Sequence, residues 1–288
     1  MRISAACMRC LIDGQERKIH SYAEEETKAR HMKEVLRIIG NSRDDATAPQ
    51  LVAYIRRSFE EHFGVQESFA EKKHFFNQML LEMEGELWRK IQTAQDPLRY
   101  ALSLSRACNY IDFGTIQKVD PDVLKQLIED TDKQIVEKSV YDKMCGELQE
   151  ASSLVYLLDN CGEIVLDKLV IRCLQERFPF LEITAVVRGM EVLNDATMED
   201  AVETGLDTMV RVVGNGTEIA GTQLSCVNEE TLRLLNTADV IIAKGQGNYE
   251  TMEGCGLNVY YLFLCKCDWF VERFRVEKNA GMFLRERK

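Results

Sequence analysis

The sequence lacks the features that take a protein to a membrane, to nucleic acid or out of the cell. No window approaches the roughly 18 uninterrupted apolar residues of a membrane-spanning helix. No basic run is present, and a formal net charge of -11 repels nucleic acid and anionic lipid. The apolar stretch at the N-terminus soon meets Arg9 and Asp13, which makes it too short for a signal peptide. We therefore expect a cytoplasmic protein with no membrane or nucleic-acid partner.

Disulfide bonds are not expected either, although the chain contains ten cysteines. These cysteines are scattered along a large chain without an export signal, so most should be reduced thiols. Cys7 and Cys10 form a Cys-x-x-Cys pair, and Cys265 and Cys267 lie near the last predicted strand. A second Cys-x-x-Cys is missing. Half of a metal site, a redox pair and a structural role therefore stay open for Cys7 and Cys10.

From about residue 20 to residue 150 the sequence favours helices. Apolar residues recur at spacings of three and four, as in the stripe Met32, Val35, Leu36 and Ile39. Breaks such as Asp96-Pro97 and Asp120-Pro121 place a proline at a first helical turn. We expect about five or six helices, and residues 1–150 are predicted to form a helical domain. All four histidines lie in such stretches among charged residues, so none is expected to be catalytic.

After residue 150 the pattern changes to short apolar runs, each followed by a helical stretch. Such apolar runs suit strands that are covered on both faces. Alternating strands and helices predict an α/β domain over residues 151–288, with a mostly parallel sheet between helices. The expected strands are Leu154 to Leu158, Ile183 to Val187, Met209 to Val213, Val240 to Ala243 and Val259 to Leu264.

Polar residues follow the first two predicted strands. Asp159 and Asn160 come directly after the first, and Gly162 lets the chain turn so that both can face one point. Asp195 lies in the loop after the second strand and could complete the set, because ligands bind beyond the carboxyl ends of parallel strands. Their oxygens are hard ligands that favour Mg²⁺ or Mn²⁺ over zinc. The pattern predicts a divalent metal site at Asp159, Asn160 and Asp195.

A structural alternative exists for part of this pattern. Asn160 and Glu163 are spaced like a helix N-cap and its return partner. Thr197 and Asp200 have the same spacing. Capping does not account for the aspartates at the two strand ends.

A third polar segment follows the fourth predicted strand. Lys244, Gly245 and Gly247 place a cation and two glycines at a strand-to-helix turn, where free backbone N–H groups attract anions. The Gly-x4-Gly-Lys-Ser/Thr spacing of a Walker A loop is absent. A lysine at the end of a buried strand needs a partner for its charge. We therefore predict that this turn binds phosphate.

Together these segments resemble the metal-dependent damage-control phosphatases, a family also called domain of unknown function 89 and acidic residue methyltransferase 1-like. Residues 159–163 resemble its Asp-Asn-x-Gly-Glu motif, residues 193–197 its Asn-Asp-x-Thr segment, and residues 244–248 its Lys-Gly-x-Gly-Asn segment. In the helical part, residues 109–114 (Asn-Tyr-Ile-Asp-Phe-Gly) resemble another family signature. The short prokaryotic branch also begins with Cys-x-x-Cys, as residues 7–10 do here. The resemblance covers most of the chain.

Two further positions bear on this resemblance. Lys73 and Asn77 stand where the family usually has a lysine and an asparagine. Glu67-Ser68-Phe69 departs from the Asp-Pro-Tyr that many relatives carry before that lysine.

The resemblance implies a helical domain packed on a Rossmann-like three-layer α/β/α domain. It also implies that Asp159, Asn160 and Asp195 hold a divalent metal, which is Mn, Mg, Co or Ni, and that Lys244 contacts phosphate; catalytic roles are expected for these four. Glu163 or Asp112 could orient the attacking water or hold a sugar hydroxyl. The residues expected to bind substrate are Lys244, Gly245, Gly247, Asn248, Glu163, Asn109 and Asp112.

The expected activity is hydrolysis of phosphate monoesters of small metabolites, such as sugar phosphates or phosphorylated cofactors, including damaged ones. One rival is an S-adenosylmethionine-dependent carboxyl methyltransferase, an activity also proposed for part of the family. The glycine-rich loop which that cofactor usually needs after the first strand is absent. A second rival is a non-catalytic metabolite- or protein-binding module. The sequence leaves open which phosphorylated metabolite, which metal and which oligomeric state apply.

Overall fold

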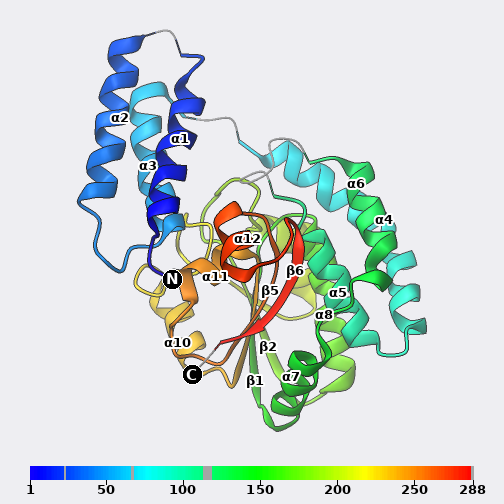
Figure 1. Cartoon of the computed structure of the whole chain (residues 1–288). Helices are drawn as coiled ribbons and strands as arrows, with labels where there is room; N and C mark the ends of the chain where they lie inside the picture. Colours follow the sequence, from blue (N-terminus) through cyan, green and yellow to red (C-terminus); the bar gives the residue numbers. More distant parts are fainter. Residues whose placement is uncertain (23, 66–67, 113–118, 287–288) are drawn as a thin grey trace.

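Helices fill the first half of the chain in the computed structural model, which describes residues 1–22, 24–65, 68–112 and 119–286 (Figure 1). Asp96 and Asp120 cap two of these helices by accepting hydrogen bonds from the backbone, and each precedes a proline in the first turn, as predicted. The helices are α1 (Ala5–Ile19), α2 (Glu25–Gly40), α3 (Ala48–Phe63), α4 (Ala70–Thr93), α5 (Pro97–Cys108), α6 (Pro121–Glu129), the 3₁₀ helix η1 (Asp130–Lys133) and α7 (Lys138–Glu150).

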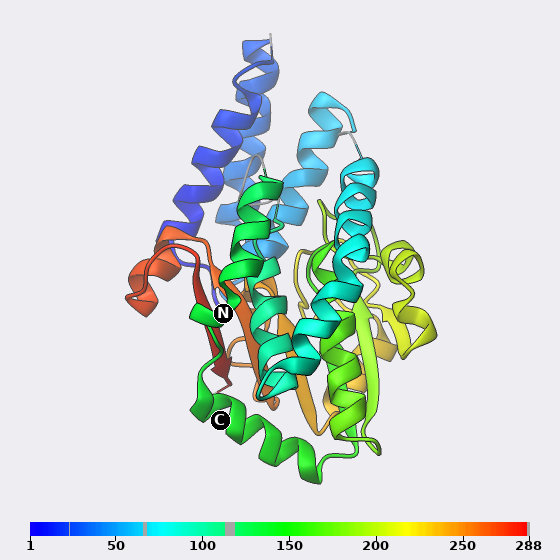
Figure 2. The same ribbon diagram turned by 90° about the vertical axis from the view of Figure 1, so that its right-hand side faces the viewer.

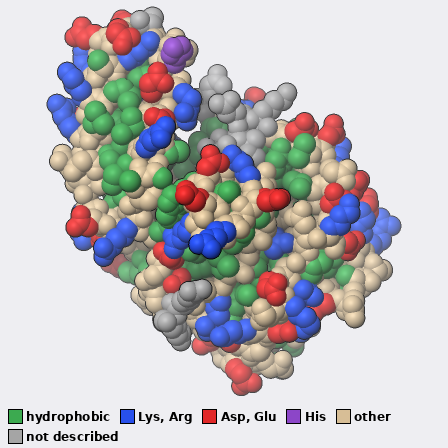
Figure 3. All heavy atoms as spheres, in the orientation of Figure 1, with side chains coloured by type: hydrophobic (Ala, Val, Ile, Leu, Met, Phe, Trp, Pro, Cys, Tyr) green, Lys and Arg blue, Asp and Glu red, His purple; other side chains and the backbone are tan. Residues whose placement is uncertain are grey.

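Helices α1, α2 and α3 form a bundle that extends away from the sheet (Figures 1 and 2). The bundle has a small apolar core of its own. Leu36, which belongs to the predicted stripe, is 52% exposed, so the apolar face of α2 is narrower than predicted. Apolar and charged side chains mix on the bundle face seen in Figure 3. The fully buried core residues are Val35, Ile39, Ala46, Leu51 and Ile55.

A six-stranded sheet follows, in the order β3-β2-β1-β4-β5-β6. The first five strands are parallel and lie where the sequence predicts them, to within two residues. β6 pairs antiparallel with β5 at the edge and was not predicted. The strands are β1 (Ser153–Leu157), β2 (Glu182–Val187), β3 (Arg211–Gly214), β4 (Val240–Lys244), β5 (Val259–Cys265) and β6 (Ala280–Arg285).

The remaining helices connect the strands and cover the sheet. They are α8 (Glu163–Arg177), α9 (Met198–Thr204), the 3₁₀ helix η2 (Leu206–Thr208), α10 (Glu229–Thr237), α11 (Gln246–Met252) and α12 (Asp268–Phe274). Helices α4, α5 and α8 lie on one side of the sheet and α10 to α12 on the other (Figures 1 and 2). The result is the predicted Rossmann-like α/β/α sandwich.

Alternate residues of each strand enter different cores, because successive side chains point to opposite faces. Leu154 and Tyr156 pack in the core beneath α4, α5 and α8. Val155 and Leu157 pack in the core beneath α10 to α12. The first core contains residues from both sides of residue 150, so α4 to α7 pack on the sheet. Helices do give way to strands near residue 150, but a division into two domains there stays a prediction.

All ten cysteines are free thiols; Cys7 is buried and Cys10 is exposed. In the described part of the chain, no group of three or more His, Cys, Asp or Glu side chains is placed to hold a metal ion. Over the same residues, no helix has the length and hydropathy needed to cross a membrane.

Candidate metal centre and phosphate site

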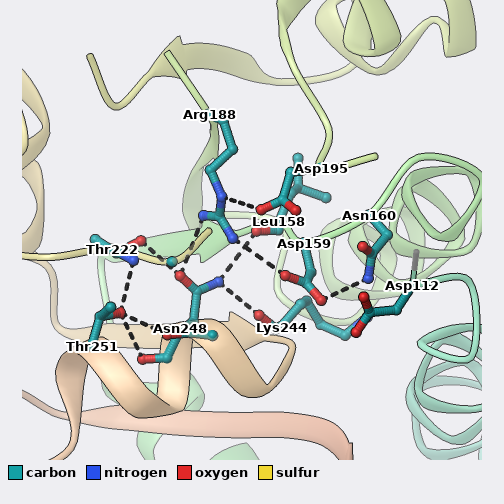
Figure 4. A network of polar contacts seen from close by, with 12 residues as sticks. Asp112, Leu158, Asp159, Asn160, Arg188, Asp195, Thr222, Lys244, Asn248 and Thr251 are labelled. Carbon is teal, nitrogen blue, oxygen red and sulfur yellow. Dashed lines mark hydrogen bonds and ion pairs between the residues drawn. The ribbon is translucent and has the colours of Figure 1, made fainter. Parts of the chain in front are cut away.

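The strand order places the carboxyl ends of β2, β1 and β4 side by side, and the predicted metal ligands lie at this edge. Asn160 and Asp195 pair in an isolated antiparallel bridge, and the Ala196 amide donates to the Asp159 carbonyl over 2.8 Å. Gly162 has φ +67°, and a Cβ there would press on Ile111 and Phe76. The structure therefore brings the three predicted ligands together (Figure 4).

Arg188 links the two aspartates and is the site residue that sequence reasoning missed. Its Nε donates to Asp195 Oδ2 over 2.6 Å, and its Nη2 donates to Asp159 Oδ1 over 3.2 Å (Figure 4). Its Nη1 reaches Asn248 Oδ1 at 3.4 Å. The Arg188 side chain is only 1% exposed, so these ion pairs are shielded from water. An arginine directly after an apolar strand was the available signal.

Side-chain amides surround the other oxygen of Asp159. Asn109 Nδ2 donates to Asp159 Oδ2 over 2.9 Å, and Asn160 Nδ2 does so over 2.7 Å. The Asn160 Oδ1 accepts from Asn194 Nδ2 over 3.1 Å. Asn160 thus turns its nitrogen toward Asp159, and ligation of a cation by this residue requires its amide to turn over.

Lys244, the last residue of β4, lies beneath these ligands and is completely buried. Its Nζ donates to Glu163 Oε1 over 2.6 Å, to Asp167 Oδ1 over 2.7 Å and to Ser105 Oγ over 2.5 Å. Although burial disfavours the charged form, Asp167 and Glu163 raise the pKa of Lys244 above its ordinary value. Lys244 is therefore a charged group inside the protein, and its expected contact with phosphate stays a prediction.

A second lysine, also missed from the sequence, lies directly after β5. Lys266 Nζ donates to Asp112 Oδ2 over 2.7 Å. Lys266 also lies close enough to Asp159 to lower the pKa of that carboxyl, against the larger effect of burial. The predicted substrate residue Asp112 thus lies beside a buried cation near the metal ligands. The rest of its signature, residues 113–114, lies outside the described part of the chain.

The turn after β4, which is predicted to bind phosphate, is held by contacts with buried parts of the protein. Gly245 has φ +81°, and a Cβ at this position would overlap the Asp159 carboxylate, so only glycine lets the turn pass Asp159. Asn248 Nδ2 donates to the carbonyls of Lys244 and Leu158 over 2.6 and 3.2 Å. Asn248 therefore holds β4 against β1, and phosphate binding by this turn stays a prediction.

The capping alternative is correct for one pair and wrong for the other. Thr197 and Asp200 form a capping box at α9. Gly162 is the N-cap of α8, which has no side-chain cap, so Asn160 and Glu163 do not cap that helix.

Lys73 and Asn77 of α4 reach the same region. Lys73 Nζ pairs with Asp200 Oδ2 at 2.6 Å, and Asn77 Oδ1 accepts from the Gly162 amide over 2.6 Å. Lys73 therefore ties α4 to α9, and Asn77 ties it to the turn that carries the predicted ligands Asp159 and Asn160. Glu67, the first residue of the departure from the family pattern, lies outside the described residues.

Negative charge exceeds positive charge at this edge of the sheet. Burial, Asp195 and Glu163 raise the pKa of Asp159 well above its ordinary value. Burial raises the pKa of Asp195 to about 6, although Arg188 opposes the shift. Lys266 and Asp112 balance each other, and so do Lys73 and Asp200. The other buried groups are four carboxylates and two cations, namely Asp159, Glu163, Asp167, Asp195, Arg188 and Lys244.

A cavity of about 450 Å³ adjoins the site at Arg188 and Thr197. Its wall also includes Lys73 and His74 from α4, together with Glu203 from α9. The cavity is mixed in charge and large enough for a small polar molecule.

The chain is similar over nearly its whole length to known proteins. The sequence pattern of the damage-control phosphatase ARMT1-like domain matches residues 3–282. A damage-control phosphatase of Pyrococcus horikoshii is 26% identical over 293 residues, which cover 100% of this chain and 99% of that protein. One of Archaeoglobus fulgidus is 29% identical over 275 residues, 93% of each chain. The crystal structure of a domain of unknown function 89 protein from P. horikoshii matches with a TM-score of 0.79 and 25% identity, covering 100% of both chains.

Proposed function

The chain belongs to the damage-control phosphatase ARMT1-like family, and on that premise we propose that it is a metal-dependent phosphatase of small phosphorylated metabolites. The proposed substrates are phosphate monoesters such as sugar phosphates or phosphorylated cofactors, including damaged ones. Asp159, Asn160 and Asp195 are the proposed ligands of a divalent metal, which is Mn, Mg, Co or Ni.

The observation that carries this proposal is the charge of the buried groups at the strand ends. Four carboxylates share two cations, so the fully ionised set has two negative charges in excess. Burying uncompensated charge is costly, and the raised pKa of Asp159 reflects that cost. A divalent cation would neutralise the excess. The residues present therefore fit the metal that the family implies.

A divalent cation bound to phosphate oxygens neutralises charge and acidifies an attacking water. The protein's own part is to hold the reacting groups in place. Arg188 keeps the carboxylates of Asp159 and Asp195 on one side of the guanidinium, which fixes the distance between them. Asn109 fixes the orientation of the Asp159 carboxylate.

We assign contact with the phosphate oxygens to Lys266. Among the described residues, its ammonium group donates only to Asp112, and an ammonium has three N–H donors. Donors fixed where charge develops lower the barrier to phosphoryl transfer. The Asp112 carboxylate, 19% exposed, is placed to accept a hydrogen bond from the attacking water or from a substrate hydroxyl. The reaction consumes one water and releases an alcohol and inorganic phosphate.

The test is a phosphatase screen of sugar phosphates and cofactor phosphates with Mg²⁺, Mn²⁺, Co²⁺ and Ni²⁺, repeated after chelation and on Asp159→Ala. We expect phosphate release that needs added metal and falls at least about 1,000-fold in the variant, because the metal supplies most of the charge stabilisation. Exposed Asp13→Ala is the matched control. Full activity in Asp159→Ala would rule out the metal assignment. Methyl transfer from S-adenosylmethionine without metal would favour the methyltransferase rival.

A further inference from the structure

Lys244 has no hydrogen-bonding capacity left for a ligand. Its side chain is 0% exposed, and its three N–H donors are taken by the carboxylates of Glu163 and Asp167 and by the Ser105 hydroxyl. Asp167 is held in turn by the Tyr156 hydroxyl, which donates to Oδ1 over 2.8 Å. A phosphate that reached Lys244 would have to displace one of these carboxylates and break an ion pair that is shielded from water.

Glu163 connects Lys244 to the proposed metal ligands. Its Oε1 accepts from Lys244, and its Oε2 accepts from Asn160 Nδ2 over 3.1 Å and from Asn109 Nδ2 over 3.0 Å. Both amides also donate to Asp159 Oδ2. A continuous buried line therefore runs from Lys244 through the Glu163 carboxylate to the two amides and to Asp159. Without the lysine, Glu163 would lose the partner that sets its orientation.

We propose, resting on the function above, that Lys244 is a positioning residue that acts through Glu163 and the Asn109 amide on the metal ligand Asp159. In this role Lys244 fixes the plane of the Glu163 carboxylate, and that carboxylate holds the Asn109 amide in place to donate to Asp159 Oδ2. Removing the lysine therefore weakens metal binding. Phosphate binding to the metal-loaded protein stays intact, since Lys266 rather than Lys244 supplies that cation.

A double-mutant cycle on Mn²⁺ affinity tests this order of action. Calorimetric titration of the full chain with MnCl₂ compares wild type, Lys244→Met, Glu163→Gln and the double variant. Changes to groups that orient metal ligands cost about 10-fold to 100-fold in affinity, so we expect each single variant to lose about tenfold. The double variant should be within about twofold of Glu163→Gln alone, because a residue that acts through another adds nothing once that residue is changed.

Binding of inorganic phosphate at saturating Mn²⁺ provides the second readout. Phosphate affinity should change by less than about twofold in Lys244→Met and fall about tenfold or more in Lys266→Met, which removes a charge-assisted donor. Losses that multiply in the double variant, or a Lys244→Met protein that binds Mn²⁺ normally but phosphate weakly, would overturn the proposal and restore direct phosphate contact by Lys244.

Two features keep the test decisive. If Lys244→Met alone does not fold, the double variant, which removes a matched cation and anion, is compared with Glu163→Gln. The Mn²⁺ titrations need no turnover. A wild type that binds Mn²⁺ but cleaves no phosphoester would overturn the phosphatase function, while the cycle would still decide the role of Lys244.

Discussion

The bundle of α1 to α3 and the site at the carboxyl ends of β1, β2 and β4 differ in the charge of their buried polar groups. In the bundle, His31 is buried against Phe59 and Phe63, and burial, His62 and Lys18 lower its pKa to about 4. The bundle thus removes charge from its interior. The strand ends instead keep four buried carboxylates beside two cations. The bundle therefore buries a neutral ring, whereas the site buries more negative than positive charge when its groups are ionised.

The largest effect should come from Asp195→Asn, which keeps the shape of the site and removes one carboxylate. We expect kcat to fall about 1,000-fold, equivalent to about 4 kcal/mol of barrier, because the metal loses a charged ligand. The melting temperature of the metal-free protein should stay within about 2 °C of wild type, since the excess negative charge decreases. Calorimetric unfolding and steady-state kinetics measure both. If Asp195→Asn lost its fold but kept normal activity in the folded fraction, Asp195 would serve stability and not the reaction, which contradicts this comparison.

The opposite pattern is expected for Leu51→Ala in the core of the bundle. Leu51 is 1% exposed, and emptying such a site costs about 3 kcal/mol of unfolding free energy. The metal ligands lie on other elements, so kcat should be unchanged. Val52→Ala, at a side chain that is 39% exposed, is the control and should cost less than about 0.5 kcal/mol. Denaturant unfolding followed by circular dichroism measures the free energy of unfolding of each variant. An equal loss at both positions would contradict the assignment of Leu51 to the core.

The smallest effect is the pH dependence that His31 gives the bundle. Its ring contacts Gln15 Oε1 and Ser58 Oγ, and its pKa is about 4 in the folded protein against 6.5 ordinarily. Between pH 4 and pH 6.5, His31 is therefore protonated in the unfolded chain and neutral in the folded chain. The stability contribution is complete above pH 6.5 and is lost as the pH falls from 6.5 to 4.

His31→Gln should flatten this dependence, and His20→Gln, at an exposed histidine, should leave it unchanged. Denaturant midpoints measured between pH 4 and pH 7 compare the three proteins. If the denaturant midpoint of His31→Gln still depended on pH as in the wild type, another group would be responsible for the effect.

The sequence predicted the five parallel strands because their apolar runs are continuous, as in Val259–Cys265. It did not predict β6, an edge strand in which only Met282 and Phe283 are buried and which includes a charged residue, Arg285. Edge strands give a weak apolar pattern, because one side of the strand has no neighbouring strand. The closeness of Asp159, Asn160 and Asp195 was predictable because they follow neighbouring strands.

The partners of the charged residues were not predictable in the same way. Lys244 is held by Ser105 from α5 and Asp167 from α8, which are 139 and 77 residues away in the chain. In the sequence, Arg188 is a basic residue in a loop, and Lys266 is a basic residue between two cysteines. Nothing there distinguishes either of them from a surface residue. Only the packing of α5 and α8 on the sheet shows that these cations are buried, and so the charge balance of the site became visible only in three dimensions.

The most direct test of the account is a calorimetric titration of the metal-free chain with MnCl₂. An excess of two negative charges predicts one Mn²⁺ bound per chain, and no binding at that site in the double variant Asp159→Asn with Asp195→Asn. If that double variant bound one Mn²⁺ with wild-type affinity, the buried carboxylates at the strand ends would not be the metal site.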